Sequence, residues 1–327
     1  QYGIEHELLA QCFMPNIGGI IAVSYVESQF EFNLISPSVL DYSVIDGTEP
    51  AESMLTVNEY IAEDYWFAVN GSSLPENLQG VRSRADEISE KYGVRILLSS
   101  QCLPACTFAE YPTTTTDQMD LADEAASINA ALDSLEEALS LYPEGFFPQF
   151  RSEFGDGGIR IMLVGGFESN FNMIGYSVQN SLWHNIYVDI FSEGLVGTYC
   201  HEIWHATEDH ITSINYGEFD VVQWAELNPD GFQYIFDPAE SILNEGDYTY
   251  FGSTKPKDCY FIDGYAKTNE REDRARIMEY AMTGFFGSEL SEYPHLYAKL
   301  RYMSDKIRQY FDTTGWSTPR WEDALGE

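Results

Sequence analysis

The most regular pattern of apolar positions along the chain lies between residues 121 and 142. Apolar side chains recur there in alternating steps of four and three residues, which places them on one face of a helix. This stripe consists of Leu121, Ala125, Ile128, Leu132, Leu135, Leu139 and Tyr142. It predicts a core-facing helix that ends before Pro143, because proline disfavours the helical conformation in the residue preceding it.

Three other stretches also have helical character. Residues 81–91 predict one helix, and residues 269–285 predict a charged helix. The apolar side of the charged helix is Met278, Ala281, Met282 and Phe285. Pro294 is well suited to the first turn of a last helix, whose core stripe is Leu296, Leu300, Met303 and Ile307.

Short runs rich in β-branched and aromatic residues predict strands. They are residues 19–26, 30–34, 65–69, 94–98, 159–164 and 185–190. The stretch from 212 to 262 is irregular, with dense Tyr, Phe, Asp, Asn, Gly and Pro. We therefore predict an α+β fold, with residues 1–75 as a β-rich N-terminal module or extension and residues 76–327 as the main domain.

The charge balance excludes one class of partner. The 327 residues include 53 acidic and only 17 basic side chains, for a formal net charge of −36. Such a surface repels phosphate backbones and anionic lipid headgroups, so we expect no nucleic-acid binding. No apolar window is long enough to span a bilayer, and no signal peptide is recognisable. Because the chain opens at Gln1, we expect a mature form whose targeting segment has been removed.

Five cysteines are too few and too scattered for a disulfide framework. Cys102 and Cys106 are close enough in sequence for one local disulfide, and they are equally compatible with free buried thiols. A zinc site built from them is disfavoured, because no second closely spaced pair of Cys or His accompanies them.

The pattern His-Glu-x-x-His at residues 201–205 is the strongest chemical signal. It lies in a predicted helix from about 194 to 209, where His201 and His205 share one face and can reach one ion. Glu202 is then placed to accept a proton from a water activated by that ion. The alternative is a solvent-facing helix with two ordinary histidines. A catalytic zinc needs a third protein ligand, so finding one is the test.

Two familiar continuations of this pattern fit poorly. The metzincin form requires glycine and histidine where this chain has Glu208 and Ile211. The thermolysin-like form requires a glutamate on a second helix, but residues 226–230 end in turn-forming Asn-Pro-Asp-Gly. His210 is near in sequence, yet its helical angle points it away from the histidine face.

A better candidate lies in residues 263–276, where Tyr-Ala-x-Thr-Asn-x-x-Glu-Asp-x-Ala runs from Tyr265 to Ala275. This stretch resembles the second motif of gluzincin peptidases of the anthrax lethal factor type, and of bacterial zinc-binding metallopeptidase lipoproteins. The resemblance spans roughly residues 88–285 and is concentrated at the two motifs. It implies a zincin-like metallopeptidase fold, Zn²⁺ as cofactor, Glu272 as the third ligand and Tyr265 as a donor to the oxyanion.

The chain departs from that family beside the ligand. Arg274 and Arg276 stand where the family has phenylalanine and a second glutamate. The carboxylate that supports a ligand histidine must then come from elsewhere, and Glu279, on the same helical face as Glu272, is one candidate. Asp273 is another candidate for orienting a histidine.

Glu272 also has an ordinary structural explanation. Asn269 can cap the helix, with Glu272 at the third position reaching back to it in a capping box. If Glu272 is not the ligand, Glu270 is the first substitute, and Glu240 and Glu245 are weaker ones.

We therefore expect a zinc-dependent endopeptidase acting on protein or peptide substrates. Zinc would be held by His201, His205 and Glu272, with Glu202 as general base and Tyr265 stabilising the oxyanion. One alternative is a non-catalytic, adhesin-like surface protein that keeps zinc for stability and binds partners through its aromatic loops. Another is a hydrolase of non-peptide amides such as cell-wall cross-links. We expect a monomer that is secreted, or held at the cell surface by a lipid anchor outside this sequence.

Overall fold

The computed structural model describes residues 7–14, 19–26, 29–35, 54–56, 74–102, 106, 111–151, 157–168, 173–180, 183–215, 219, 221–237, 251 and 257–326. The α-helices are α4 (Gln79–Tyr92), α6 (Glu124–Ser140), α7 (Leu195–Asn215), α8 (Val221–Ala225), α10 (Glu270–Met282), α11 (Pro294–Tyr310) and α12 (Arg320–Asp323). The strands are β1 (Glu7–Met14), β2 (Gly19–Val26), β3 (Gln29–Ile35), β4 (Met54–Thr56), β5 (Arg95–Leu98), β6 (Thr113–Thr114), β7 (Gly158–Val164), β8 (Gly166–Phe167), β9 (Gly175–Asn180) and β10 (Trp183–Asp189). These elements confirm a mixed α+β architecture.

A mixed four-stranded sheet forms the centre of the main domain, in the order β5-β7-β10-β9. β5, β7 and β10 run parallel, whereas β9 pairs with β10 in the antiparallel direction and lies at the edge. The predicted strands at 94–98, 159–164 and 185–190 are therefore confirmed as β5, β7 and β10. β9 was not predicted.

Alternating side chains of β7 serve two cores, as the two-residue period of a strand requires. Ile159, Ile161 and Leu163 pack into the large core with the helices, while Met162 and Val164 face a smaller cluster on the other side of the sheet. This burial on both faces explains why residues 159–164 of β7 are apolar at every position except Arg160.

Cys102 and Cys106 are buried in the smaller cluster as free thiols, so the alternative of a local disulfide is wrong for this structure. Their burial raises the pKa of both thiols, and that of Cys106 to about 12. Neither thiol is therefore a ready nucleophile at neutral pH.

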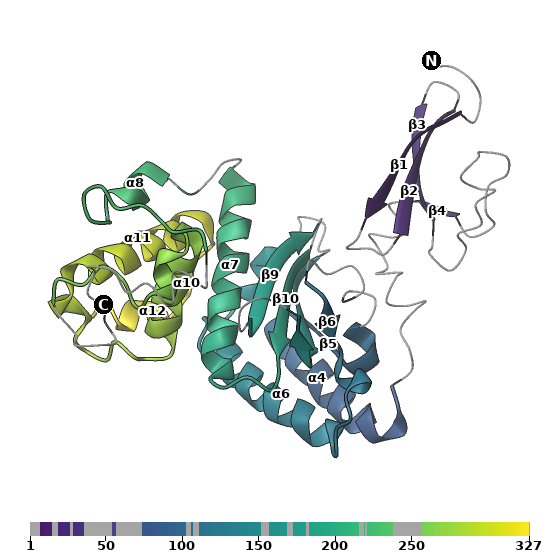
Figure 1. Ribbon diagram of the computed structural model, residues 1–327, viewed down its shortest axis with the longest axis horizontal. Helices are drawn as coiled ribbons and strands as arrows, with labels where there is room; N and C mark the ends of the chain where they lie inside the picture. The colour runs from purple at the N-terminus through teal and green to yellow at the C-terminus, as the bar shows by residue number, and fades with distance from the viewer. Residues whose placement is uncertain are drawn as a thin grey trace.

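Helix α7 runs between the sheet and the C-terminal helices α10, α11 and α12, as Figure 1 shows. Residues 197–208 of this helix are all buried. Six of them are nevertheless polar: Thr198, His201, Glu202, His205, Thr207 and Glu208. Because a buried polar group costs free energy unless it is paired, these side chains require partners from the neighbouring elements. The alternative of a solvent-facing helix with ordinary histidines is wrong.

The periodic stripes predict the long helices well and their ends less well. Leu121 lies outside α6, because the side chain of Asp123 accepts a hydrogen bond from the N–H of Ala126 and starts the helix there. Phe285 lies beyond α10 and is 65% exposed, whereas Met278, Ala281 and Met282 are buried as predicted.

Near the N-terminus, β1, β2, β3 and β4 form a separate antiparallel sheet. The strands predicted at 19–26 and 30–34 are confirmed as β2 and β3. The strand predicted at 65–69 lies outside the described residues. None of the described helices has the length and apolar character needed to cross a membrane.

Candidate metal centre

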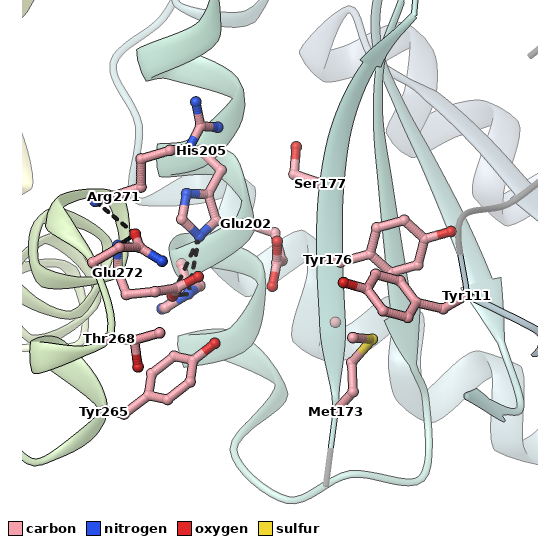
Figure 2. A pocket seen from close by; sticks show the side chains of 13 residues that line it. Tyr111, Met173, Tyr176, Ser177, Glu202, His205, Tyr265, Thr268, Arg271 and Glu272 are labelled. Atoms are coloured by element: carbon pink, nitrogen blue, oxygen red, sulfur yellow. Dashed lines mark hydrogen bonds and ion pairs between the residues drawn. The ribbon is translucent and has the colours of Figure 1, made fainter. Parts of the chain in front are cut away.

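A pocket of about 250 Å³ lies where α7, the edge strand β9 and the first turn of α10 meet. Figure 2 shows β9 on one side and the residues of α10 on the other, with Glu202 between them. His201, Glu202 and His205 line the pocket together with Tyr265 and Glu272. All five residues predicted for the site are thus brought to one cavity.

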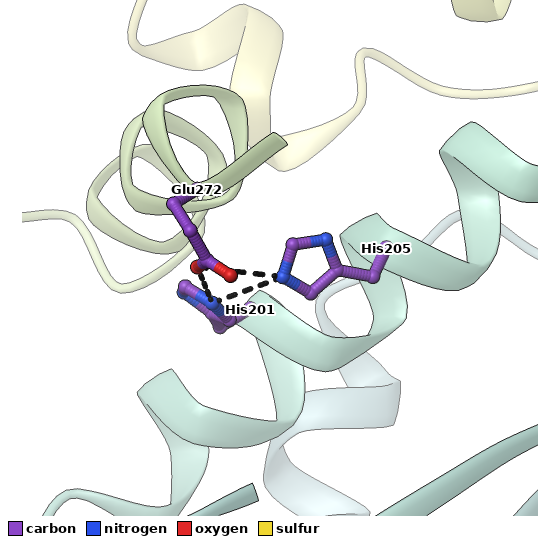
Figure 3. Close-up of side chains that lie close together, drawn as sticks. All are labelled: His201, His205 and Glu272. Atoms are coloured by element: carbon purple, nitrogen blue, oxygen red, sulfur yellow. Dashed lines mark hydrogen bonds and ion pairs between the residues drawn. The ribbon is translucent and has the colours of Figure 1, made fainter. Parts of the chain in front are cut away.

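The two histidines of α7 and Glu272 of α10 converge on one point, as Figure 3 shows. The Nε2 atoms of His201 and His205 are 3.2 Å apart. The Oε2 atom of Glu272 lies 3.0 Å from Nε2 of His201 and 3.6 Å from Nε2 of His205. Each residue can therefore offer one ligand atom to a shared ion.

These spacings fit a tetrahedral zinc ion. Nitrogen and oxygen ligands at about 2.0–2.1 Å from a tetrahedral centre lie about 3.3 Å from one another, close to the three distances observed here. Two imidazoles and one carboxylate also leave the fourth position of a tetrahedral centre open, as in catalytic zinc sites. Among the described residues, this is the one group of three or more His, Cys, Asp or Glu side chains able to hold a metal.

The local fold explains why Glu272 points at the histidines. The side chain of Asn269 caps α10 by accepting hydrogen bonds from the N–H groups of Arg271 and Glu272. The Asn269 cap is therefore confirmed, but the carboxylate of Glu272 faces His201. Burial opposes ionisation of this carboxyl, but the charges of His205 and His201 and hydrogen bonds to both rings outweigh it, holding its pKa well below the usual range. The ligand interpretation of Glu272 fits this arrangement better than a capping box.

Glu279 supports His201 from behind. Its Oε2 atom lies 3.2 Å from Nδ1 of His201, so Nδ1–H donates and Nε2 is left to face the ion position. Gly197 makes this approach possible, because a Cβ atom there would lie 3.0 Å from Oε1 of Glu279. The predicted contact of Glu279 with a histidine of the motif is confirmed.

The prediction that Asp273 orients a histidine is wrong. Asp273 is fully buried and points away from α7 to accept hydrogen bonds from Lys299 at 2.7 Å and from the hydroxyl of Tyr234 at 2.9 Å. It faces away because consecutive helical positions differ by about 100°, so Glu272 and Asp273 cannot share one face.

The two arginines that depart from the family pattern are both paired. Arg274 makes a buried two-point ion pair with Glu208 of α7, at 2.5 and 3.0 Å. Arg276 bonds to both Asp263 and Glu279. Arg274 thus ties α10 to α7, and Arg276 holds the carboxylate that supports His201.

Glu202 lies buried in the pocket and has one carboxylate oxygen that is unpaired within the described part of the chain. It is 4% exposed, and its Oε2 atom has no hydrogen-bond partner among the described residues. Burial, only partly offset by His201 and His205, raises the pKa of this carboxyl. β9 comes close enough to cover it because residue 175 is glycine: a Cβ atom there would lie 3.0 Å from Oε1 of Glu202.

Tyr265 occupies a short 3₁₀ turn, η7 (Tyr265–Lys267), just before α10. Its ring centroid is 6.3 Å from that of His201. Burial and the nearby charge of Glu272 raise the pKa of the phenol above its usual range. The hydroxyl therefore keeps its proton at neutral pH and can donate a hydrogen bond into the pocket.

Other candidates do not join the site. His210 points away as predicted and packs among Phe150, His184 and Phe311. Glu270 is not part of the ligand group, and Glu240 and Glu245 lie outside the described residues.

Sequence reasoning missed the β9 wall of the pocket and the contribution of Arg271. Gly175 and Ser177 line the pocket from β9, and Arg271 lines it from α10. The alternation of Tyr176 and Val178 with smaller or polar neighbours was the available signal for a half-buried edge strand.

Comparisons of the chain with protein families, with curated proteins and with solved structures find no match. The function is therefore argued from the geometry of the site.

Proposed function

We propose that this chain is a zinc-dependent peptidase with a zincin-like fold. The observation that carries the proposal is the convergence of His201, His205 and Glu272 on one point, with the buried Oε2 atom of Glu202, unpaired among the described residues, in the same pocket. A merely structural zinc site has four protein ligands and is closed. Three ligands beside a pocket and a buried carboxylate with an unpaired oxygen favour hydrolysis.

The arrangement of the sheet supports the same proposal. β9 is the antiparallel edge strand of the central sheet, and its residues Gly175 and Ser177 line the pocket beside α7. An extended peptide can add to such an edge through main-chain hydrogen bonds. A peptide bound in this way would pass directly over Glu202, which suits a protein or peptide substrate.

In the proposed reaction His201, His205 and Glu272 hold zinc. The ion, when bound, supplies Lewis-acid chemistry that lowers the pKa of a water and polarises the scissile carbonyl. Glu202 takes the proton of the attacking water and hands it to the leaving amine. Its raised pKa suits both steps, because an effective general base and acid has a pKa nearer to neutrality.

Two neighbours complete the proposed mechanism. Tyr265 keeps its proton and donates a hydrogen bond to the developing oxyanion. Glu279 accepts the Nδ1–H of His201, which fixes the ring and strengthens it as a ligand.

The competing interpretation of a non-catalytic binding protein was motivated by Arg274 and Arg276. Both are now accounted for by ion pairs that hold α10 and Glu279 in place, so neither marks a degenerate site. No described feature favours a cell-wall amide over a peptide bond. We keep secretion or attachment to the cell surface as part of the proposal.

The decisive experiment measures zinc content and turnover together. We expect one zinc per chain by elemental analysis, and cleavage of a proteome-derived peptide library by the wild-type protein. Glu202→Gln should retain the zinc and lose about 10²- to 10⁴-fold in rate, the usual contribution of a general acid–base. Protein that binds no stoichiometric zinc after supplementation, or a Glu202→Gln variant with wild-type turnover, would overturn the proposal.

A further inference from the structure

Arg271 is the one lysine or arginine among the described residues that line the pocket. It stands directly before the ligand Glu272, in a chain where only 17 residues are basic against 53 acidic ones. In so acidic a protein, surface composition alone does not account for a cation in the cleft, so its position calls for an explanation.

Its geometry leaves most of the guanidinium available. Nη1 of Arg271 donates to Oδ1 of Asp209 on α7 at 2.6 Å. The side chain of Arg271 is 42% exposed, whereas that of Asp209 is only 16% exposed. In Figure 2 the guanidinium lies beside His205, while Tyr265 lies at the opposite end of the pocket.

The other two arginines of α10 show the contrast. The side chain of Arg274 is 2% exposed and closed in its pair with Glu208, and that of Arg276 is 19% exposed and bonded to two carboxylates. Both are used to hold the fold together. Among the described residues, Arg271 has one carboxylate partner, Asp209, and its side chain is partly exposed.

Asp209 prepares this arginine for a ligand. By fixing one N–H, it restricts the rotation of the guanidinium in advance, so less conformational entropy is lost on binding. The remaining N–H groups form the planar fork that matches a carboxylate at two points. Arg271 lines the pocket and Asp209 does not, so the pair presents its cationic partner to the cleft.

We propose that Arg271 binds a carboxylate of the substrate close to the cleaved bond. This carboxylate belongs either to an Asp or Glu side chain of the substrate or to the C-terminus of the substrate. The inference rests on the proposed peptidase function. It deepens that function by naming a preferred substrate class, peptides with an acidic group at one defined position. That preference is opposite to the basic one that the net charge of the protein alone would favour.

The first arm of the test is a cleavage profile. Zinc-loaded wild-type protein is incubated with a peptide library, with free and with amidated C-termini, and the cleaved bonds are read by mass spectrometry. We expect Asp or Glu to be enriched at one position, or cleavage to be confined to bonds near a free C-terminus. Loss of cleavage on amidation assigns the terminal carboxylate, and its persistence assigns a side chain.

The second arm compares matched peptides carrying the preferred carboxylate or its neutral amide. Wild-type kcat/KM should be at least about tenfold higher for the carboxylate peptide, the value of a hydrogen bond to a charged group. Arg271→Gln should bring this ratio close to one at unchanged zinc content. Arg271→Lys should restore part of the ratio, because it keeps the charge and loses the fork.

Arg84→Gln is the matched control. Arg84 is also paired with an aspartate, Asp133 at 2.5 Å, but it joins α4 to α6 and does not line the pocket. Arg84→Gln removes one positive charge, as Arg271→Gln does, and should leave the ratio of kcat/KM for the carboxylate and amide peptides unchanged.

The outcomes separate the two proposals. The role of Arg271 is overturned if the wild-type enzyme has no acidic preference or prefers Lys or Arg. It is also overturned if the Arg271→Gln variant keeps the ratio. In each case the peptidase function still stands. If zinc-loaded protein cleaves nothing, the peptidase function fails. The role of Arg271 is defined on a cleaved substrate, so it fails together with the peptidase function in that case.

Discussion

The hydrogen bond between Glu279 and His201 makes a quantitative prediction about zinc affinity. Glu279→Gln keeps the size of the side chain and removes the charge that holds the Nδ1–H of His201. Loss of such a partner typically weakens metal binding about 10- to 100-fold. The observed 3.2 Å is at the long end of the range for N–H···O hydrogen bonds, so we expect the lower part, about 10- to 30-fold or about 1.4–2 kcal/mol.

The assay is competition for zinc with a chromophoric chelator of known affinity, at fixed pH and salt. Glu270→Gln is the matched control, because it also removes one negative charge from the same helix. Glu270 does not belong to the ligand group.

Two results would refute the reasoning. An unchanged zinc affinity in Glu279→Gln would mean that the carboxylate behind His201 does not support the ligand. An equal loss in Glu270→Gln would mean that a general effect of charge on α10, and not this hydrogen bond, controls affinity.

Three other predictions concern turnover and stability. Tyr265→Phe should lower kcat about 10²- to 10³-fold with full zinc content; retained activity would exclude an oxyanion role. Lys299→Met should destabilise the fold by about 3–5 kcal/mol in urea unfolding, because it leaves Asp273 charged and buried, and Asp273→Leu in the same chain should recover most of that loss. Burial and His210 lower the pKa of His184 to about 3. Below pH 6.5 the unfolded chain therefore takes up a proton there that the folded chain does not, and stability falls by about 1.4 kcal/mol per pH unit. Between pH 6.5 and 5 the wild type should lose about 2 kcal/mol more stability in urea unfolding than His184→Phe does; identical pH profiles would assign the loss elsewhere.

Local pattern was enough to predict the long helices and the parallel strands, but not the short helices α8 and α12. The stripe from Ile128 to Leu139 is buried on α6, and the runs at 159–164 and 185–190 became β7 and β10. These elements could be predicted because the spacing of apolar side chains along the chain is enough to identify them. The helix ends depended on caps such as Asp123, which a periodic pattern does not record.

The sequence left Glu272 open between a metal ligand and a capping-box residue, because both are compatible with its spacing of three residues from Asn269. Asn269 caps α10 through backbone N–H groups, which leaves the carboxylate of Glu272 free to face His201. Only the placement of α7 against α10 could distinguish a capping box from a ligand, and no local pattern contains that placement.

The supporting contacts were out of reach for the same reason. The pair of Arg274 with Glu208 joins residues that are distant in sequence, and neither residue has a local signature of its partner. β9 was missed because its alternation of Tyr176 and Val178 with polar residues is short, and because Gly175 alone gives no sign that Glu202 of α7 lies against this strand.

The division of the site between α7 and α10 has a consequence for how such a cleft can diversify. Between His205 and Glu272 the chain has 66 residues that supply no metal ligand in the described structure. Closing a flexible loop costs entropy that grows only with the logarithm of its length, so even doubling this interval adds about 0.6 kcal/mol. The ion pairs between the two helices already hold the ligands in register. Insertions and deletions in this interval are therefore a thermodynamically inexpensive way to reshape substrate access while the metal centre is preserved.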